Sequence, residues 1–90
     1  MTFEKLLLKY NFDVEFIGCK YLKFIIDNHQ RGDLLKDVLQ KTTQEYNISI
    51  AALREAINRC KRNSFFDQVT IKKMVNRLIL ELETGMDDIE

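Results

Sequence analysis

The pattern of apolar and polar positions predicts that the chain is organised around two short helices near its middle. In the second of them, apolar residues recur at the i, i+3, i+4, i+7 spacing of one helical face. These residues are Leu53, Ala56, Ile57 and Cys60. Asn47 interrupts the pattern, and asparagine tolerates the left-handed backbone of a tight turn. Ser49 is placed to cap the next turn by accepting free backbone amides. Residues 41–62 therefore predict a helix-turn-helix, with its second helix over 50–62.

Apolar stripes on both sides of this motif predict further helices. We expect them over residues 2–9, 14–28, about 34–39 and 70–83. Thr2, Asp13 and Asp33 are each placed to cap one of these helices. No stretch shows the period-two alternation that is typical of a strand. The expected fold class is therefore all-α, a bundle of five to six helices that contains the helix-turn-helix.

The helix over 14–28 is expected to lie at the centre of the bundle. Its apolar stripe includes Val14 and Ile17 and is widened by Phe16, so neighbours are expected to contact it from two sides. Gly18 within a helix costs about 1 kcal/mol relative to alanine. We expect a glycine there because another helix approaches closely.

The length and composition fit one globular domain. The chain has 90 residues, of which 46% are hydrophobic, and it contains no proline. We expect a single domain over 1–84, whose core Phe65 and Phe66 plug from a loop, and a frayed acidic tail over 85–90. No apolar run approaches the roughly 18 residues needed to cross a bilayer. Since the first residues do not resemble a signal peptide, we expect a cytoplasmic protein without membrane contact.

The chain has few residues of the types that act in catalysis or bind metal ions, and their spacing fits neither role. Cys19 and Cys60 fall on apolar stripes, where a reduced cysteine acts as a small hydrophobe, and no disulfide is expected. His29 is the only histidine and lies near the end of a predicted helix, where capping is the expected role. There is no nucleophile paired with a base and no glycine loop for phosphate. We therefore expect no enzyme activity, metal, cofactor or small-molecule substrate.

The charge is distributed unevenly although the net charge is zero. Residues 1–49 carry seven basic and seven acidic side chains, whereas residues 50–79 carry seven basic and two acidic ones, an excess of +5. Residues 80–90 carry five acidic side chains and no basic one. A basic patch on the predicted second helix beside an acidic tail is typical of a nucleic-acid-binding protein. Because the patch is modest, binding by a monomer is expected to be weak and sensitive to salt.

The polar face of the helix over 50–62 supplies side chains that recognise DNA. The base-reading candidates are Arg54, Glu55, Asn58 and Arg59. Arginine is suited to guanine and asparagine to adenine. The phosphate-binding candidates at the edges of the motif are Lys41, Gln44, Ser49, Lys61 and Arg62. A second interpretation is a solvated face, in which Glu55 and Arg59 form an i,i+4 ion pair worth a few tenths of a kcal/mol.

Three stretches of the chain match a known family. The first is Gly18-Cys19-Lys20-Tyr21-Leu22, followed by Gly32 and Lys36. The second is Tyr46-Asn47-Ile48-Ser49, followed by Leu53-Arg54-Glu55-Ala56-Ile57-Asn58. The third is Met74-Val75-Asn76-Arg77-Leu78, followed by Leu80-Glu81. Together they resemble the C-terminal effector domain of the sporulation initiation factor, stage-zero sporulation protein A. This resemblance spans nearly the whole chain. It implies an all-α transcription regulator that binds double-stranded DNA through a helix-turn-helix, often as a pair of domains, so a homodimer is possible.

The chain departs from that family in three respects. The family's receiver domain, whose phosphorylation controls dimerisation, does not occur in these residues, and the segment 63–69 is shorter than the family's. The recognition surface also differs. Where the family has, in order, an arginine, a glutamate, an arginine and a histidine, this chain has Ala52, Arg54, Glu55 and Arg59. The positions that match the family imply a shared fold and no shared contacts with DNA bases. They are Gly18, Tyr21, Leu22, Asn47, Ala56 and Ile57.

Two functions are compatible with the sequence. In the first, the protein is a small bacterial DNA-binding transcription regulator that resembles a response-regulator effector domain. In the second, it is a protein-interaction module of the same fold that modulates a related regulator without binding DNA. The acidic residues of the tail fit the second function, since they would repel DNA or occupy a basic surface of a partner.

Overall fold

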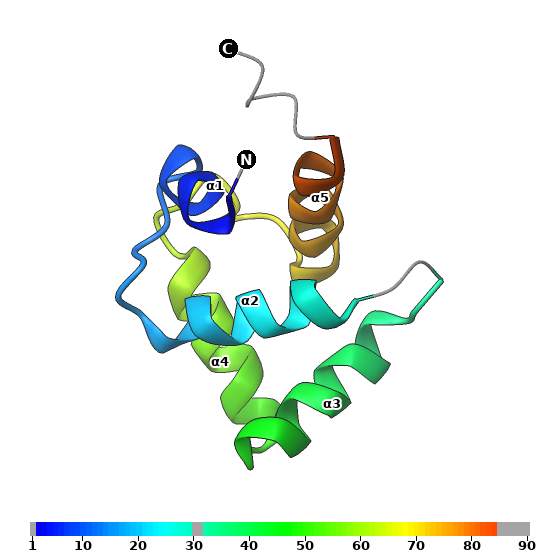
Figure 1. Cartoon of the computed structure of the whole chain (residues 1–90). Helices are drawn as coiled ribbons and strands as arrows, with labels where there is room; N and C mark the ends of the chain where they lie inside the picture. The colour runs from blue at the N-terminus through cyan, green and yellow to red at the C-terminus, as the bar shows by residue number, and fades with distance from the viewer. Residues whose placement is uncertain (1, 30–31, 85–90) are drawn as a thin grey trace.

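The computed structural model describes residues 2–29 and 32–84, and over these ranges the chain folds into five helices (Figure 1). They are α1 (Phe3–Lys9), α2 (Ile17–Asn28), α3 (Leu35–Tyr46), α4 (Ile50–Lys61) and α5 (Ile71–Thr84). These ranges contain no strand. The all-α prediction is therefore confirmed, whereas the tail predicted over 85–90 lies outside the described residues.

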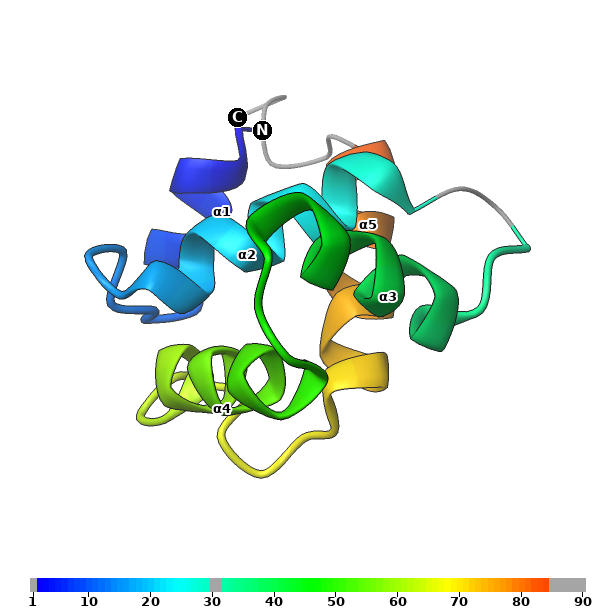
Figure 2. The ribbon, with the colours of Figure 1, turned by 90° about the horizontal axis from the view of Figure 1, so that it is seen from below.

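The central helix of the fold is α2. It contacts α3, α4 and α5, most extensively α4, while α1 packs against α5. Figure 2 shows α4 along one edge of the molecule. Every helix contributes fully buried side chains to one common core. These side chains are Leu6, Leu22, Ile25, Val38, Leu39, Thr42, Leu53, Ile57, Cys60, Met74, Val75 and Leu78.

Gly18 allows α2 and α4 to approach each other closely. A Cβ atom at this position would lie 2.1 Å from the carbonyl oxygen of Ala56 and 2.7 Å from the Cβ atom of Cys60. Both distances are too short for a real side chain, so any residue other than glycine would push the helices apart. The predicted close approach is confirmed. Cys60 and its neighbour across the contact, Cys19, are buried free thiols.

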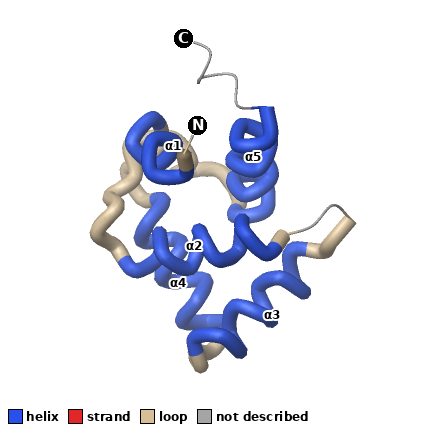
Figure 3. The backbone as a smooth tube through the Cα atoms, in the orientation of Figure 1, coloured by secondary structure: helices blue, strands red, loops and turns tan. Residues whose placement is uncertain are grey.

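The start of α2 differs from the prediction. The helix begins at Ile17 rather than Val14, because residues 13–16 form a separate turn, which Figure 3 shows as part of a loop. Asp13 stabilises that turn, since its carboxylate and its carbonyl oxygen accept backbone N–H groups at 3.1 Å and 3.2 Å. The prediction that Val14, Phe16 and Ile17 are buried is wrong, because all three side chains are exposed.

The helix α3 is continuous where two segments were predicted. The sequence predicted a short helix over 34–39 and a separate motif helix from Lys41, but the backbone is helical from Leu35 to Tyr46. Thr42 and Thr43 account for the error, since threonine is a poor choice for a core. Their hydroxyl groups donate to carbonyl oxygens of the preceding turn at 2.8 Å and 2.6 Å, so burial leaves no polar group unpaired.

One of the three N-caps predicted outside the motif is confirmed, and His29 lies at the predicted C-cap position of α2. The hydroxyl oxygen of Thr2 accepts a backbone N–H of α1 at 3.2 Å. The N-cap positions of α2 and α3 are occupied by Phe16 and Leu34, neither of which has a side-chain acceptor. The predictions that Asp13 and Asp33 occupy these positions are therefore wrong.

Of the two adjacent phenylalanines after α4, only one fills the core. Phe66 is buried, with its ring centroid 4.8 Å from that of Tyr10 and 5.9 Å from that of Phe12. The rings of Phe65 and Tyr10 are nearly perpendicular, with centroids 5.9 Å apart, but 70% of Phe65 is exposed. The prediction is confirmed for Phe66 and wrong for Phe65.

Candidate nucleic-acid interface

Three residues join α3 to α4 and fix the relation between the two helices. Asn47 ends α3 in the left-handed conformation, with φ of 53° and ψ of 50°, and Thr43 accepts backbone N–H groups from the turn. Ser49 begins α4, and its Oγ accepts the backbone N–H of Ala52 at 3.1 Å. The predicted break at Asn47 and the predicted cap at Ser49 are both confirmed. In Figure 1 this turn lies at the end of the molecule opposite to the start of α1 and the end of α5.

The helix α4 has one buried and one exposed face. Leu53, Ile57 and Cys60 of the predicted stripe are fully buried, and Ala56 is partly buried. The four base-reading candidates, Arg54, Glu55, Asn58 and Arg59, are all exposed. Successive helical residues are rotated by about 100°. The two arginines are therefore about 140° apart around the helix axis, on opposite edges of the exposed face, with Glu55 and Asn58 between them.

Glu55 and Arg59 form the ion pair that their i,i+4 spacing predicted. The guanidinium lies 3.0 Å from the carboxylate, and both side chains are about two-thirds exposed, at 65% and 66%. Water screens such a pair strongly, so it contributes only a few tenths of a kcal/mol. Arg59 can therefore exchange this partner for another anion at little cost.

Four of the five phosphate-binding candidates lie at the surface. Lys41 and Gln44 are exposed on α3, and Arg62 is exposed directly after α4. Ser49 is exposed as well, but its side chain already caps α4. A phosphate contact at Ser49 would use the hydroxyl proton, because phosphate oxygens accept hydrogen bonds, and the cap leaves this proton available since Ser49 only accepts there.

The prediction that Lys61 is a phosphate contact is wrong. The residue is only 8% exposed, and its Nζ donates to the carbonyl oxygens of Phe66 at 3.3 Å and Asp67 at 2.7 Å. The ammonium group thus holds the segment between α4 and α5 against the domain. The burial of Lys61 could have been predicted from the helical period, because Lys61 follows Ile57 by four residues and so continues the buried stripe.

The basic excess of residues 50–79 is divided between two helices. Three exposed arginines belong to α4 and its end: Arg54, Arg59 and Arg62. Three exposed cations belong to α5: Lys72, Lys73 and Arg77. The last of these lies 3.6 Å from the carboxylate of Glu81. Only half of the predicted patch therefore lies on α4.

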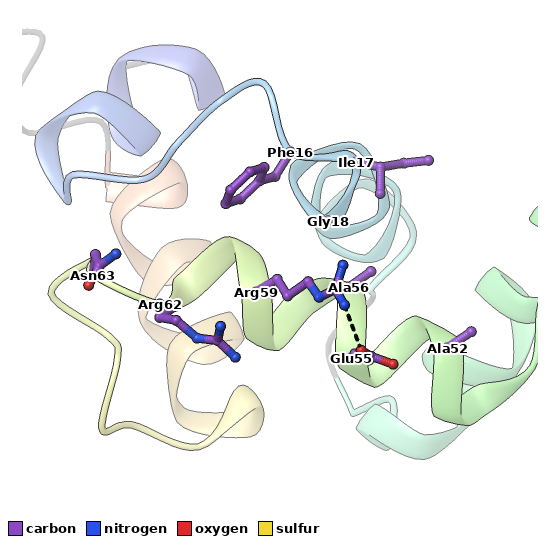
Figure 4. Close-up of a pocket in the computed structure, with 9 residues that line it drawn as sticks. All are labelled: Phe16, Ile17, Gly18, Ala52, Glu55, Ala56, Arg59, Arg62 and Asn63. Carbon is purple, nitrogen blue, oxygen red and sulfur yellow. Dashed lines mark hydrogen bonds and ion pairs between the residues drawn. The ribbon is translucent and has the colours of Figure 1, made fainter.

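A groove of about 530 Å³ separates the start of α2 from α4 (Figure 4). Its lining residues are Phe16, Ile17, Gly18, Ala52, Glu55, Ala56, Arg59, Arg62 and Asn63. The sequence did not reveal this groove, because Phe16 and Ile17 were placed in the core. The groove includes two of the base-reading candidates, Glu55 and Arg59.

Comparison with protein-family models, curated proteins and solved structures finds no match for this chain. Within the described ranges, no helix combines the length and apolar character needed to cross a membrane. The same ranges hold no cluster of three or more histidine, cysteine, aspartate or glutamate residues that is arranged to bind a metal ion.

Proposed function

We propose that this protein is a transcription regulator that binds double-stranded DNA and places α4 in the major groove. One observation carries the proposal: α4 follows α3 through a three-residue turn and presents four exposed polar side chains at the surface. In a helix-turn-helix, the second of two helices that are joined by such a short turn lies in the major groove, and we assign this role to α4.

The chemistry of the exposed face of α4 supports base recognition. Arg54 and Arg59 can each donate two hydrogen bonds to O6 and N7 of guanine, and Asn58 can pair in the same manner with adenine. Glu55 can accept a hydrogen bond from N4 of cytosine. Because the two arginines lie on opposite edges of the face, a single α4 would contact bases on both sides of its axis.

Phosphate contacts would come from both ends of the motif. Lys41 and Gln44 on α3 and Arg62 after α4 are exposed cations or donors, and the N-terminus of α4 adds the positive end of its helix dipole. Two cationic side chains, Lys41 and Arg62, make a small electrostatic contribution. A homodimer on two half-sites about 34 Å apart would bind more tightly than a monomer.

The resemblance to the sporulation initiation factor effector domain supports the same function. Gly18 and Ala56, two of its matched positions, face each other where α2 meets α4. Asn47, a third, occupies the left-handed turn. We propose that the protein acts in the cytoplasm of a bacterium, as that family does.

The alternative function is a protein-interaction module that modulates a related regulator without binding DNA. The ion pair between Glu55 and Arg59 favours it, because it offsets part of the positive charge on the face that would meet phosphates. The two functions differ in one simple property, affinity for duplex DNA.

Fluorescence anisotropy of a labelled random-sequence duplex at low salt tests the proposal. We expect binding at micromolar protein. Arg54→Ala and Arg59→Ala should each weaken it and reduce its salt dependence, since each removes one cation from the helix that faces the duplex, and binding to random sequence is mainly electrostatic. Lys5→Ala removes the same charge from the exposed surface of α1 and should leave the affinity nearly unchanged.

Two results would contradict the proposal. Absence of binding at micromolar protein would remove the DNA function and favour the interaction module. An equal loss of affinity in Lys5→Ala would show that binding depends on overall charge and not on α4.

A further inference from the structure

The groove beside α4 combines an apolar wall with two cationic groups. Its volume of about 530 Å³ lies in the range of pockets that bind small molecules, about 300–1,000 Å³. The close contact between Gly18 and Ala56 closes its floor. In Figure 4 the ring of Phe16 projects from the start of α2 toward α4, and the side chain of Arg59 runs along α4 to its ion pair with Glu55. A ligand in the groove would thus meet an aromatic ring from α2 and a guanidinium from α4.

The apolar side chains at the groove are exposed to water and are held in place. Phe16 is 46% exposed and Ile17 is 58% exposed, although both are large hydrophobic residues. The turn stabilised by Asp13 fixes the backbone immediately before them, so they cannot fold back into the core. Covering this surface with an apolar group would be favourable by about 25 cal/mol per Å². Because the wall is already formed, little ordering is needed when a ligand binds.

The cationic groups at the groove are available to an anion. Arg62 has no side-chain hydrogen bond or ion pair with any described residue, and Arg59 has only its exposed partner Glu55. The charged lining residues, Arg59, Arg62 and Glu55, leave a net charge of one positive unit. The groove therefore favours a ligand that carries one negative charge next to an apolar group.

We propose that this groove binds a small amphiphilic anion, an aromatic or aliphatic carboxylate. Its apolar part lies against Phe16 and Ala56, and its carboxylate lies between the guanidinium groups of Arg59 and Arg62. Arginine forms two parallel hydrogen bonds with a carboxylate, which gives the site its preference for this headgroup. The site is a binding site and not a catalytic one. It does not depend on whether the protein binds DNA.

Binding of anilinonaphthalene sulfonate, a fluorescent aromatic anion, tests the site on the full chain without DNA. We expect saturable fluorescence enhancement with one site per chain. Phenylbutyrate should displace the dye, and phenylbutanol, which has the same apolar part and no charge, should displace it about tenfold less effectively, since the bonds to the guanidinium groups are lost.

Three variants locate the binding site. Phe16→Ser should weaken binding of both phenylbutyrate and phenylbutanol. The double variant Arg59→Gln, Arg62→Gln should weaken binding of phenylbutyrate about tenfold and leave phenylbutanol unchanged. Leu80→Ser alters an equally exposed apolar residue on α5 and should change neither. Circular dichroism should show the same helix content in all three, because the replaced side chains are exposed.

Several outcomes would overturn the proposal. Absence of dye binding would show that the groove does not bind an amphiphilic anion. Dye that neither competitor displaces would show adventitious binding of an additive only. Equal affinities in Phe16→Ser and the wild type would place the dye elsewhere. A dimer in sedimentation experiments that Phe16→Ser dissociates would assign the groove to a second copy. If the dye instead binds only after Asp87, Asp88 and Glu90 are replaced by neutral residues, that result would assign the groove to the acidic tail.

Discussion

The ammonium group of Lys61 donates hydrogen bonds to two backbone carbonyl groups of the segment that follows α4. The carbonyl oxygen of Phe66 also accepts the backbone N–H of Val69 at 3.0 Å, so the carbonyl oxygen of Asp67 is the one that relies on Lys61 for a donor. Arg62, the next residue, carries the same charge and is exposed. Two adjacent cations thus serve different purposes, one in folding and one at the surface.

Replacing Lys61 by methionine should destabilise the protein. The substitution keeps the aliphatic stem and removes the donors. The carbonyl oxygen of Asp67 then loses its donor, whereas that of Phe66 keeps the backbone N–H of Val69, so we expect a cost of about 1–3 kcal/mol in the free energy of unfolding. Urea denaturation measures this value. Arg62→Gln, the matched control, should change it by no more than about 0.5 kcal/mol. Equal losses in the two variants would contradict the structural role of Lys61.

Gly18, like Lys61, is a residue whose role is set by packing and not by its intrinsic preference, which for glycine is against a helix. Glycine weakens a helix by about 1 kcal/mol relative to alanine. The Cβ atom of an alanine would however lie only 2.1 Å from the Ala56 carbonyl oxygen. The close approach of two buried helices outweighs the intrinsic cost of the glycine.

At the scale of elements, a polar cluster joins α1 to α5 beside the apolar core. The carboxylate of Glu81 accepts hydrogen bonds from the Lys9 ammonium at 2.8 Å and from the Tyr10 hydroxyl, and Arg77 lies 3.6 Å away. Burial by itself raises the pKa of Glu81, but the hydrogen bonds from Lys9 and Tyr10 and the nearby charges outweigh burial. They hold the pKa below its usual value. The charged form of Glu81 therefore stabilises the contact between the two helices.

This cluster should make the stability of the protein depend on pH in the acid range. Because the pKa of Glu81 is lower in the folded than in the unfolded state, its contribution is complete above the unfolded pKa of about 4.3. The contribution is lost as the pH falls through the folded pKa. Thermal unfolding of Glu81→Gln should show a lower midpoint than the wild type at pH 7. This difference should shrink toward pH 3.

The control for this prediction is Glu83→Gln, which neutralises an exposed carboxylate on the same helix. We expect its midpoint to follow that of the wild type at every pH. A difference between wild type and Glu81→Gln that stays constant from pH 7 to pH 3 would contradict the role of the charged carboxylate.

At the scale of the whole molecule, the two proposed binding surfaces overlap. Glu55 and Arg59 belong both to the exposed face of α4 and to the groove. Arg54 lies on the other edge of the helix and does not line the groove. A carboxylate that engages Arg59 would therefore compete with DNA for one of the base-reading residues.

If both proposals hold, a groove ligand should release DNA. Saturating phenylbutyrate should lower the anisotropy of a labelled duplex bound to the wild type, whereas phenylbutanol with matched salt should not. Phe16→Ser should bind the duplex normally and lose its sensitivity to phenylbutyrate, because Phe16 belongs to the groove and not to the DNA-binding face. If phenylbutyrate does not release the duplex from the wild type, the groove and the DNA-binding face act independently.

The sequence alone determined the features that depend on neighbours within one or two helical turns. The caps at Thr2 and Ser49, the left-handed turn at Asn47 and the pair between Glu55 and Arg59 all form between residues at most a few positions apart. The buried stripe of α4 is local in the same sense, because the helical period places its residues on one face. These features could be predicted because their partners lie close by in the chain.

Only the tertiary structure decided the features that depend on which elements meet. Residues 14–17 carry an apolar pattern, yet α2 starts late and leaves Phe16 exposed at a groove. Lys61 is buried because the segment after α4 folds back over it, and Thr42 is fully buried in the core that α3 shares with α2 and α4. An apolar residue becomes core, and a charged one surface, only when packing between distant segments has fixed what covers it. The chain pattern records a preference for burial, whereas the packing determines whether burial occurs.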